Sequence, residues 1–498
     1  MPMGTNDSSN HRSAFRQIMK GTAIFGGTQV ITMLTNIVRG KLVAMILGAY
    51  GMGVTSLLNS AIQPVQQLFS CGLPMASVSS IANAADDKER AQRTIAFRRC
   101  LTILSILACI FVIASSSLLC KWTFGNTGHS SWFAGLGLAV LFLMLSTGES
   151  AILQSHRALK QLAKCNILAP MLGLVLGVPM YFIWGVGGIV PAMILLAFIT
   201  WAYSRWNTRG LGIRASQSWR ETLTYGRGMM MLGATMMVAG LIGNLSVYLI
   251  NTFINGNGST DDVGFYQSAN TITTQCTAMV FTALATDFYP HLTQVAKDFK
   301  AMTRLINQEG EIVLLVTAPV AALLIVCSPI VVRLLLTSEF DCIVPIVQMM
   351  SLAFLMRAYY FPLDYICLAK GDKTYYFCME GIWANVKMLV IFIGGYRLWG
   401  LIGLGYAAVL NAVVDIIVST VLVRWRYNIV YGGRMLLMSA FLILLASSTM
   451  LASLVGEGWI SYVVSSALVA VIIAYSLVQL NKRISIVDAV RNRLHRRE

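Results

Sequence analysis

Charged side chains lie inside apolar stretches of this chain that are long enough to cross a lipid bilayer. Arg39, Arg357 and Lys387 are the clearest cases. A charge in hydrocarbon is costly, so such residues face a water-filled cavity, a partner charge or a substrate. Arginine stays protonated and donates paired hydrogen bonds to phosphate oxygens. These residues therefore predict a membrane-embedded site for an anion.

Uncharged polar residues follow the helical repeat beside these cations. A spacing of three or four residues places them on one face of each helix. The stripes are Thr32, Asn36 and Arg39; Asn59, Gln63, Gln66 and Ser70; and Asn244, Tyr248, Asn251 and Asn255. Such stripes predict the wall of a wet, cationic cavity inside the bilayer.

The candidate site residues fall into two groups. The predicted substrate-binding residues are Asn36, Arg39, Lys41, Asn59, Gln63, Asn244, Asn270, Arg357, Tyr360 and Lys387. Ion coupling is predicted for the carboxylates Glu149, Asp364 and Asp415, because a desolvated carboxylate favours proton uptake. Three alternatives stay open: Lys387 is neutralised by Asp415, Arg357 and Asp364 form a buried pair, or Lys41 only extends to the outer interface.

The composition is that of an integral membrane protein. Of 498 residues, 56% are hydrophobic and 12% are charged, whereas soluble proteins average about 25% charged residues. The 37 Lys and Arg exceed the 21 Asp and Glu, but the basic residues gather in alternate loops. This excess therefore reports membrane orientation and does not indicate a nucleic-acid partner.

Several chemical classes are disfavoured by missing motifs. The 10 cysteines are scattered without paired spacing, so they predict neither a disulfide framework nor a metal site. The sequence contains no Gly-x-x-x-x-Gly-Lys-Ser/Thr loop for ATP and no hydrolytic nucleophile motif. We therefore expect a transporter without cofactor or enzymatic activity, with H+ or Na+ as the coupling ion.

About fourteen segments are long and apolar enough to span the membrane. Basic loops remain in the cytoplasm, so both termini are predicted to be cytoplasmic. A weak internal repeat relates Gly53–Asn59 to Gly264–Asn270 and Arg157–Lys160 to Lys370–Lys373. Two six-helix lobes in the same orientation would place a binding cavity between them.

The predicted fold is therefore an all-α polytopic membrane protein with two pseudo-symmetric lobes and a C-terminal helix pair. Its expected parts are a cytoplasmic tail (1–18), an N-lobe (19–205), a cytoplasmic linker (206–228), a C-lobe (229–427), an extra helix pair (428–480) and a basic cytoplasmic tail (481–498).

Together these features resemble the Wzx-type flippases, the polysaccharide transport branch of the multidrug/oligosaccharidyl-lipid/polysaccharide exporter superfamily. The resemblance covers nearly the whole chain and rests on Arg39–Leu42, Gly72–Pro74, Gly264–Gln267 and Tyr289–Pro290 at helix ends. It implies that an undecaprenyl-diphosphate-linked oligosaccharide, such as an O-antigen or enterobacterial common antigen unit, crosses the bacterial inner membrane by alternating access. Membrane lipids, a glycan polymerase and chain-length machinery are the further partners that we expect.

Other functions stay open at this point. The extra helix pair also occurs in lipid II flippases, which keeps a peptidoglycan precursor or a teichoic-type substrate in view. A cation-coupled multidrug exporter of the same superfamily would need a cavity rich in acids and aromatics, whereas mid-membrane Arg and Lys favour an anion. A polytopic glycosyltransferase or polymerase is disfavoured by the absence of a long periplasmic loop and of an acidic sugar-nucleotide motif.

Overall fold

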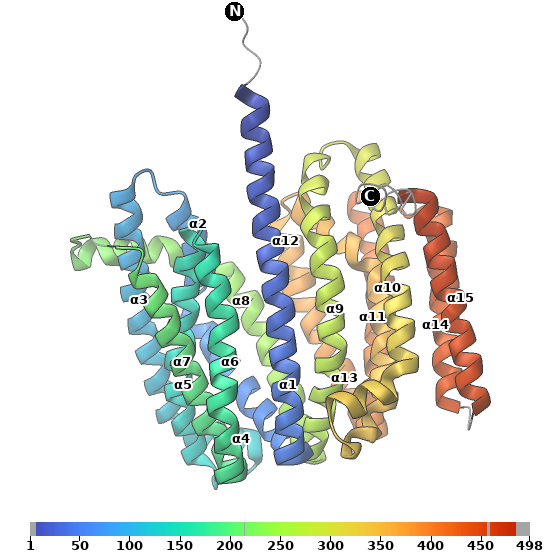
Figure 1. Cartoon of the computed structure of the whole chain (residues 1–498), viewed down its shortest axis with the longest axis horizontal. Helices are drawn as coiled ribbons and strands as arrows, with labels where there is room; N and C mark the ends of the chain where they lie inside the picture. The colour runs from blue at the N-terminus through green and yellow to red at the C-terminus, as the bar shows by residue number, and fades with distance from the viewer. Residues whose placement is uncertain (1–5, 214, 456–458, 485–498) are drawn as a thin grey trace, which may run out of the picture. The chain divides into compact units, whose positions relative to one another are not determined.

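Helices joined by turns and loops form the described chain in a computed structural model of the protein (Figure 1). The structure describes residues 6–213, 215–455 and 459–484, and these ranges contain no β-strand. A helix satisfies its own backbone hydrogen bonds, which is what a bilayer without water requires. The predicted all-α membrane fold is confirmed.

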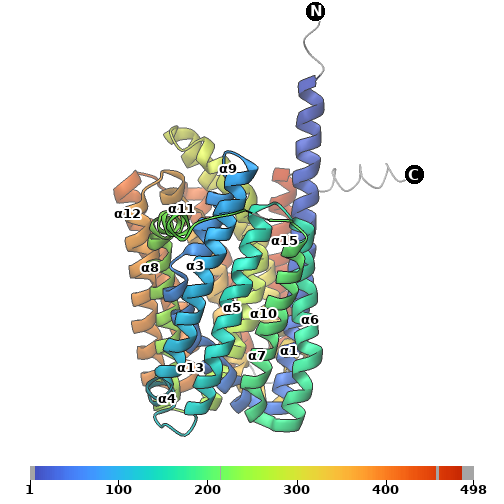
Figure 2. The same ribbon diagram turned by 90° about the vertical axis from the view of Figure 1, so that its left-hand side faces the viewer.

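The chain forms two compact units that meet in sequence at Gly256 and Asn257. The helices of the first unit are α1 (Asn6–Ser70), α2 (Leu73–Ala82), α3 (Asp87–Ala114), α4 (Ser116–Phe124), α5 (Ser130–Ser155), α6 (Leu159–Trp184), η1 (Gly185–Gly188), α7 (Ile189–Arg209) and α8 (Trp219–Asn257). Figure 2 shows α5 between α3 and α7. Buried Phe97, Phe133, Leu136 and Ile152 fill the core that these three helices share.

Helix α8 packs within the first unit, although it covers the predicted start of the C-lobe at residue 229. The Tyr248 hydroxyl lies 2.9 Å from the Thr123 hydroxyl, and Asn255 Nδ2 donates to the Thr123 carbonyl at 2.8 Å. Two members of the predicted polar stripe thus bind α4 instead of facing a cavity. The boundary between the compact units therefore differs from the predicted lobe boundary.

A close backbone contact joins α8 to the turn before α2. A Cβ atom added to Gly233 would lie 2.5 Å from the carbonyl oxygen of Gly72, which itself has a left-handed φ of 67°. Only residues without a side chain allow this approach. The Gly72–Pro74 motif therefore has a packing role in this unit.

We expect Gly233→Ala to lower the free energy of unfolding by about 1–3 kcal/mol, because the new methyl group overpacks this contact. The measurement is the apparent unfolding midpoint of the purified protein in detergent. Gly228→Ala is the matched control on the same helix, since its Cβ would meet nothing within 4 Å. Equal midpoints for the two variants would show that the contact is not tight.

The second unit contains the remaining helices. They are α9 (Thr260–Gln294), α10 (Phe299–Leu335), η2 (Ser338–Ile343), α11 (Val344–Ala369), α12 (Lys373–Tyr376), η3 (Phe377–Trp383), α13 (Ala384–Tyr427), α14 (Gly433–Val455) and α15 (Trp459–Ile484). Ser259, Asp298 and Asp372 cap α9, α10 and α12 by accepting hydrogen bonds from backbone N–H groups of the first turn. The predicted extra helix pair, α14 and α15, packs on α10.

Glycine lies at three sharp breaks between helical segments. Gly48 and Gly400 interrupt α1 and α13 with φ and ψ of 64° and −164°, and of 60° and −143°. Gly185 separates α6 from α7 with similar angles. Residues with a Cβ atom rarely adopt this backbone region, so glycine allows the chain to reverse within a few residues.

Ten helical segments in the described part of the chain are long and apolar enough to span a membrane. Three of them contain the glycine breaks, and dividing them would give thirteen segments. The threonine-rich helix α9, which is not among the ten, would be the fourteenth. The count of about fourteen and the cytoplasmic termini stay predictions, and most of the C-terminal tail lies outside the described residues.

The ends of α5 and α11 share one backbone motif. Arg157 and Gly371 take left-handed φ angles of 53° and 69°. In each turn the next N–H, of Ala158 or Asp372, donates to the carbonyl five residues earlier at 2.9 Å. This Schellman arrangement is local support for the predicted repeat. In this motif Arg157 corresponds to Gly371, whereas the predicted repeat aligns Arg157 with Lys370. The two alignments differ by one residue.

Candidate functional site

Several predicted site residues line one pocket of about 330 Å³ within the second unit. We call it the charged pocket. Helix α11 contributes its first part, and η3 and α13 complete it. Its main polar residues are Arg357, Tyr360, Asp364, Glu380, Lys387, Asn411 and Asp415.

Lys387 and Asp415 form an ion pair across the two arms of α13. The side chain of Lys387 is only 5% exposed, and its Nζ donates to Asp415 Oδ1. Asn411 Nδ2 donates to the other carboxylate oxygen at 3.1 Å. Each charge compensates the other, because a single buried charge without a partner would destabilise the protein in a low-dielectric site. The alternative that Asp415 neutralises Lys387 is thus the one that this geometry favours.

Two further carboxylates, those of Asp364 and Glu380, face the same pocket. Within the described residues, the structure gives neither carboxylate a hydrogen bond. The charged pocket is lined by three carboxyl groups and two basic groups, Arg357 and Lys387. This surplus of carboxyl groups suits a small cation or a proton and does not suit a diphosphate.

A π-helical turn brings Glu380 into the pocket. The segment η3 is π-helical, so its backbone hydrogen bonds span five residues instead of four, and Asn385 Nδ2 also donates to the carbonyls of Glu380 and Gly381 at 3.0 and 2.9 Å. Turns of this kind are frequent at functional sites. The wider turn changes the register between Glu380 and Lys387 from that of a regular α-helix.

Arg357 lines both the charged pocket and a neighbouring groove of about 620 Å³ between α9 and α11. We call this the hydroxyl groove; it is lined by Thr274, Thr277, Phe281, Thr282, Tyr289, Arg357, Phe361 and Tyr365, among others. The Arg357 guanidinium lies 5.5 Å from the centre of the Phe281 ring. This cation–π contact positions the charge where the two cavities adjoin.

The hydroxyl groove presents acceptors for sugar hydroxyl groups. Thr274 and Thr277 each donate their own proton to a backbone carbonyl of α9, at 2.6 and 2.8 Å. Their oxygen lone pairs then remain available to accept hydrogen bonds. Aromatic rings and one guanidinium complete a surface that fits a glycan next to a phosphate.

The other predicted substrate-binding residues lie outside the charged pocket. Asn36 and Gln63 are exposed, while Arg39, Lys41 and Asn244 are half-buried in the first unit. The remaining two, Asn59 and Asn270, are half-buried on α1 and α9, and Asn59 Nδ2 donates to the Thr55 carbonyl at 2.9 Å. Their contact with a substrate stays a prediction.

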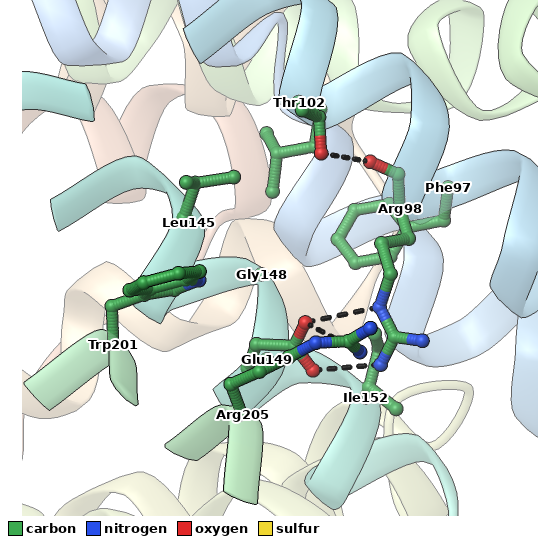
Figure 3. Close-up of a pocket in the computed structure, with 10 residues that line it drawn as sticks. Phe97, Arg98, Thr102, Leu145, Gly148, Glu149, Ile152, Trp201 and Arg205 are labelled. Atoms are coloured by element: carbon green, nitrogen blue, oxygen red, sulfur yellow. Dashed lines mark hydrogen bonds and ion pairs between the residues drawn. The ribbon is translucent and has the colours of Figure 1, made fainter. Parts of the chain in front are cut away.

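Glu149 lies in a second cluster, within the first unit (Figure 3). Its carboxylate accepts from Arg98 Nε and Nη2 at 3.0 and 2.8 Å, from Arg205 at 3.4 Å and from the Thr208 hydroxyl at 2.6 Å. Two guanidinium groups stabilise the ionised carboxylate, which favours a link between α3, α5 and α7. The predicted coupling role of Glu149 stays a prediction.

Residues 79–345, more than half of the chain, match the model of a protein family described as "Polysaccharide biosynthesis protein". The chain belongs to this polysaccharide biosynthesis family. No protein with a curated description matches this family member in sequence.

Solved structures share the fold of this polysaccharide biosynthesis protein at low sequence identity. The lipid II flippase MurJ, in an inward closed conformation, is 12% identical with a TM-score of 0.68, covering 93% of this chain and 99% of its own. An inward-facing multidrug resistance MATE transporter is 16% identical with a TM-score of 0.67, covering 80% and 94%. A transporter of the same superfamily from Pyrococcus furiosus is 14% identical with a TM-score of 0.57, covering 81% and 95%. These matches show that the chain shares the fold of these flippases and transporters.

Two of the main polar residues of the charged pocket in this polysaccharide biosynthesis protein, Asn411 and Glu380, are missing from the predicted site. Asn411 lies four residues before Asp415, and that spacing could have indicated a contact on one helix face. Glu380 lies seven residues before Lys387, a helical spacing, but its place in the pocket depends on the π-helical turn, for which the sequence has no simple signal.

Proposed function

We propose that this protein is a flippase for a lipid-linked oligosaccharide. It moves an undecaprenyl-diphosphate-linked glycan, such as an O-antigen or enterobacterial common antigen unit, from the inner to the outer leaflet of the bacterial inner membrane. The observation that carries the proposal is the position of Arg357 at both the hydroxyl groove and the charged pocket. Membership of the polysaccharide biosynthesis family supports a glycan as cargo, and the fold shared with a lipid II flippase supports a lipid carrier.

In this proposal Arg357 donates paired hydrogen bonds to the diphosphate, while the threonine oxygens of the hydroxyl groove accept from sugar hydroxyls. The charged pocket takes H+ or Na+, because its carboxylates outnumber its cations. Arg357 contributes its charge to both sites, so occupancy of one changes the affinity of the other, which is the requirement for coupling. The protein is then a transporter without a cofactor, and a glycan polymerase with chain-length machinery consumes its product.

A multidrug exporter is the second candidate, and one observation favours it. The acid excess of the charged pocket, together with Tyr375 and Trp383 in its lining, would suit an organic cation. The shared fold includes multidrug resistance transporters. A lipid II substrate is the alternative within flippases, since that lipid also carries a diphosphate next to sugars.

The test is translocation by the purified protein in liposomes. We expect a fluorescent undecaprenyl-diphosphate-linked oligosaccharide to become accessible to an impermeant quencher faster than in protein-free vesicles, and faster still with a H+ or a Na+ gradient. Fluorescent lipid II and a lipophilic dye cation serve as parallel cargoes. Transport of the dye alone would establish the exporter, transport of lipid II alone would establish the alternative flippase, and no transport of any cargo would refute the proposal.

A further inference from the structure

A small pocket in the first unit, separate from the charged pocket, has the chemistry of an anion site (Figure 3). It has a volume of about 230 Å³ and lies between α3, α5 and α7. Arg98, Glu149, Trp201 and Arg205 are its main polar and aromatic residues. Nothing in the proposed transport cycle uses it.

The charges in this pocket do not balance. Two guanidinium groups face one carboxylate, which leaves an excess of one positive charge. His156, just past α5, does not add to this excess at neutral pH, because burial lowers its pKa and the charges of Arg90 and Arg98 lower it further. One bound anion would therefore neutralise the charge of the pocket.

The two guanidinium groups of the pocket are more exposed than the carboxylate that they bind. The Glu149 side chain is 6% exposed, whereas those of Arg98 and Arg205 are 23% and 32% exposed. Glu149 occupies Arg98 Nε and Nη2 and Arg205 Nη1. Among the described residues, no acceptor contacts Arg98 Nη1 or the Nε and Nη2 of Arg205. An incoming phosphate would find donors from two helices without displacing Glu149.

The surroundings of the pocket match the interface of a membrane. The pocket lies toward the α3 start and the α5 and α7 ends, where Lys88, Arg157 and Arg209 are found, and the positive-inside pattern assigns this end to the cytoplasm. Trp201 packs with Phe142 and Phe198, and Phe198 is exposed. Basic pockets between spanning helices on this side of a membrane suit lipid headgroups.

We propose that this pocket binds the phosphate headgroup of an anionic phospholipid from the cytoplasmic leaflet, with the acyl chains along Phe142 and Phe198. A phosphodiester carries one negative charge, which matches the excess of one positive charge. A polyprenyl diphosphate carries more charge than the pocket would compensate. The bound lipid ties α3 to α7 across α5, so anionic phospholipid stabilises the first unit.

The experiment measures phosphatidylglycerol retained by the full-length protein in native mass spectra, against phosphatidylcholine as the neutral lipid. We expect Arg205→Gln to weaken phosphatidylglycerol binding by at least about fivefold, since one basic group near an anionic headgroup contributes on that scale. Arg209→Gln, an exposed basic residue one turn away on α7, is the matched control and should change binding less than about twofold. Phosphatidylcholine retention should be the same in all three proteins.

Arg98→Gln is the second variant, because it removes the excess positive charge while Arg205 and Thr208 still bind the Glu149 carboxylate. It should lose phosphatidylglycerol even if Arg205→Gln fails to fold. If wild type, Arg205→Gln and the second variant retain equal amounts of phosphatidylglycerol, the proposal is wrong. It is also wrong if Arg209→Gln loses as much phosphatidylglycerol as Arg205→Gln. If undecaprenyl diphosphate displaces phosphatidylglycerol and needs Arg205 to bind, the pocket belongs to the substrate lipid and the phospholipid assignment is wrong.

Discussion

Replacing Arg357 with glutamine should lower the initial rate of glycan translocation by about 100-fold or more. The guanidinium is the cation of the hydroxyl groove and would donate two charge-assisted hydrogen bonds to the diphosphate. Each such bond contributes about 1.5–3 kcal/mol, and 1.4 kcal/mol corresponds to a tenfold change. The measurement is quencher accessibility of a fluorescent lipid-linked oligosaccharide in liposomes, at matched protein content.

Two further variants make this result specific. Arg357→Lys keeps the positive charge but loses the planar pair of donors, so its rate should fall by about tenfold. Arg333→Gln is the matched control in the same unit, because Arg333 is 68% exposed and pairs with Asp341 away from both cavities. A wild-type rate for Arg357→Gln, or an equal loss for Arg333→Gln, would remove Arg357 from the mechanism.

The second large effect is expected at the buried ion pair of the charged pocket. Lys387→Met should destabilise the protein by about 3–5 kcal/mol, because it leaves Asp415 without its cation in a low-dielectric site. Asp415→Leu should have a similar effect by leaving Lys387 unpaired. The readout is the apparent unfolding midpoint of purified protein in detergent, with Arg333→Gln again expected to change little.

The double variant Lys387→Met/Asp415→Leu separates pairing from simple loss of contacts. It should recover most of the stability lost by each single variant, since replacing both charges of a buried pair by apolar groups is often neutral or stabilising. Losses that add in the double variant would mean that the two side chains contribute independently.

The membrane class and the helices could be predicted from the sequence because they depend on local information. Apolar runs of spanning length predict helices whatever their neighbours are. The turn glycines are also local, because the break at Gly48 depends on the backbone angles of that residue alone. The membership of α8 could not be predicted, because hydrogen bonds from Tyr248 and Asn255 to Thr123 join residues more than a hundred positions apart.

The candidate site divides in the same way. Helical spacing places Arg357, Tyr360 and Asp364 on one face of α11, and all three line the charged pocket. Spacing leaves open whether Lys387 meets Asp415 or a substrate, since that depends on how the two arms of α13 pack. Helical spacing also does not predict the contacts of Glu149 with Arg98 and Arg205, which lie 51 and 56 residues away in the sequence. Periodicity determines which residues share a helix face, whereas the rotation and packing of neighbouring helices decide which faces meet, and that depends on the whole core.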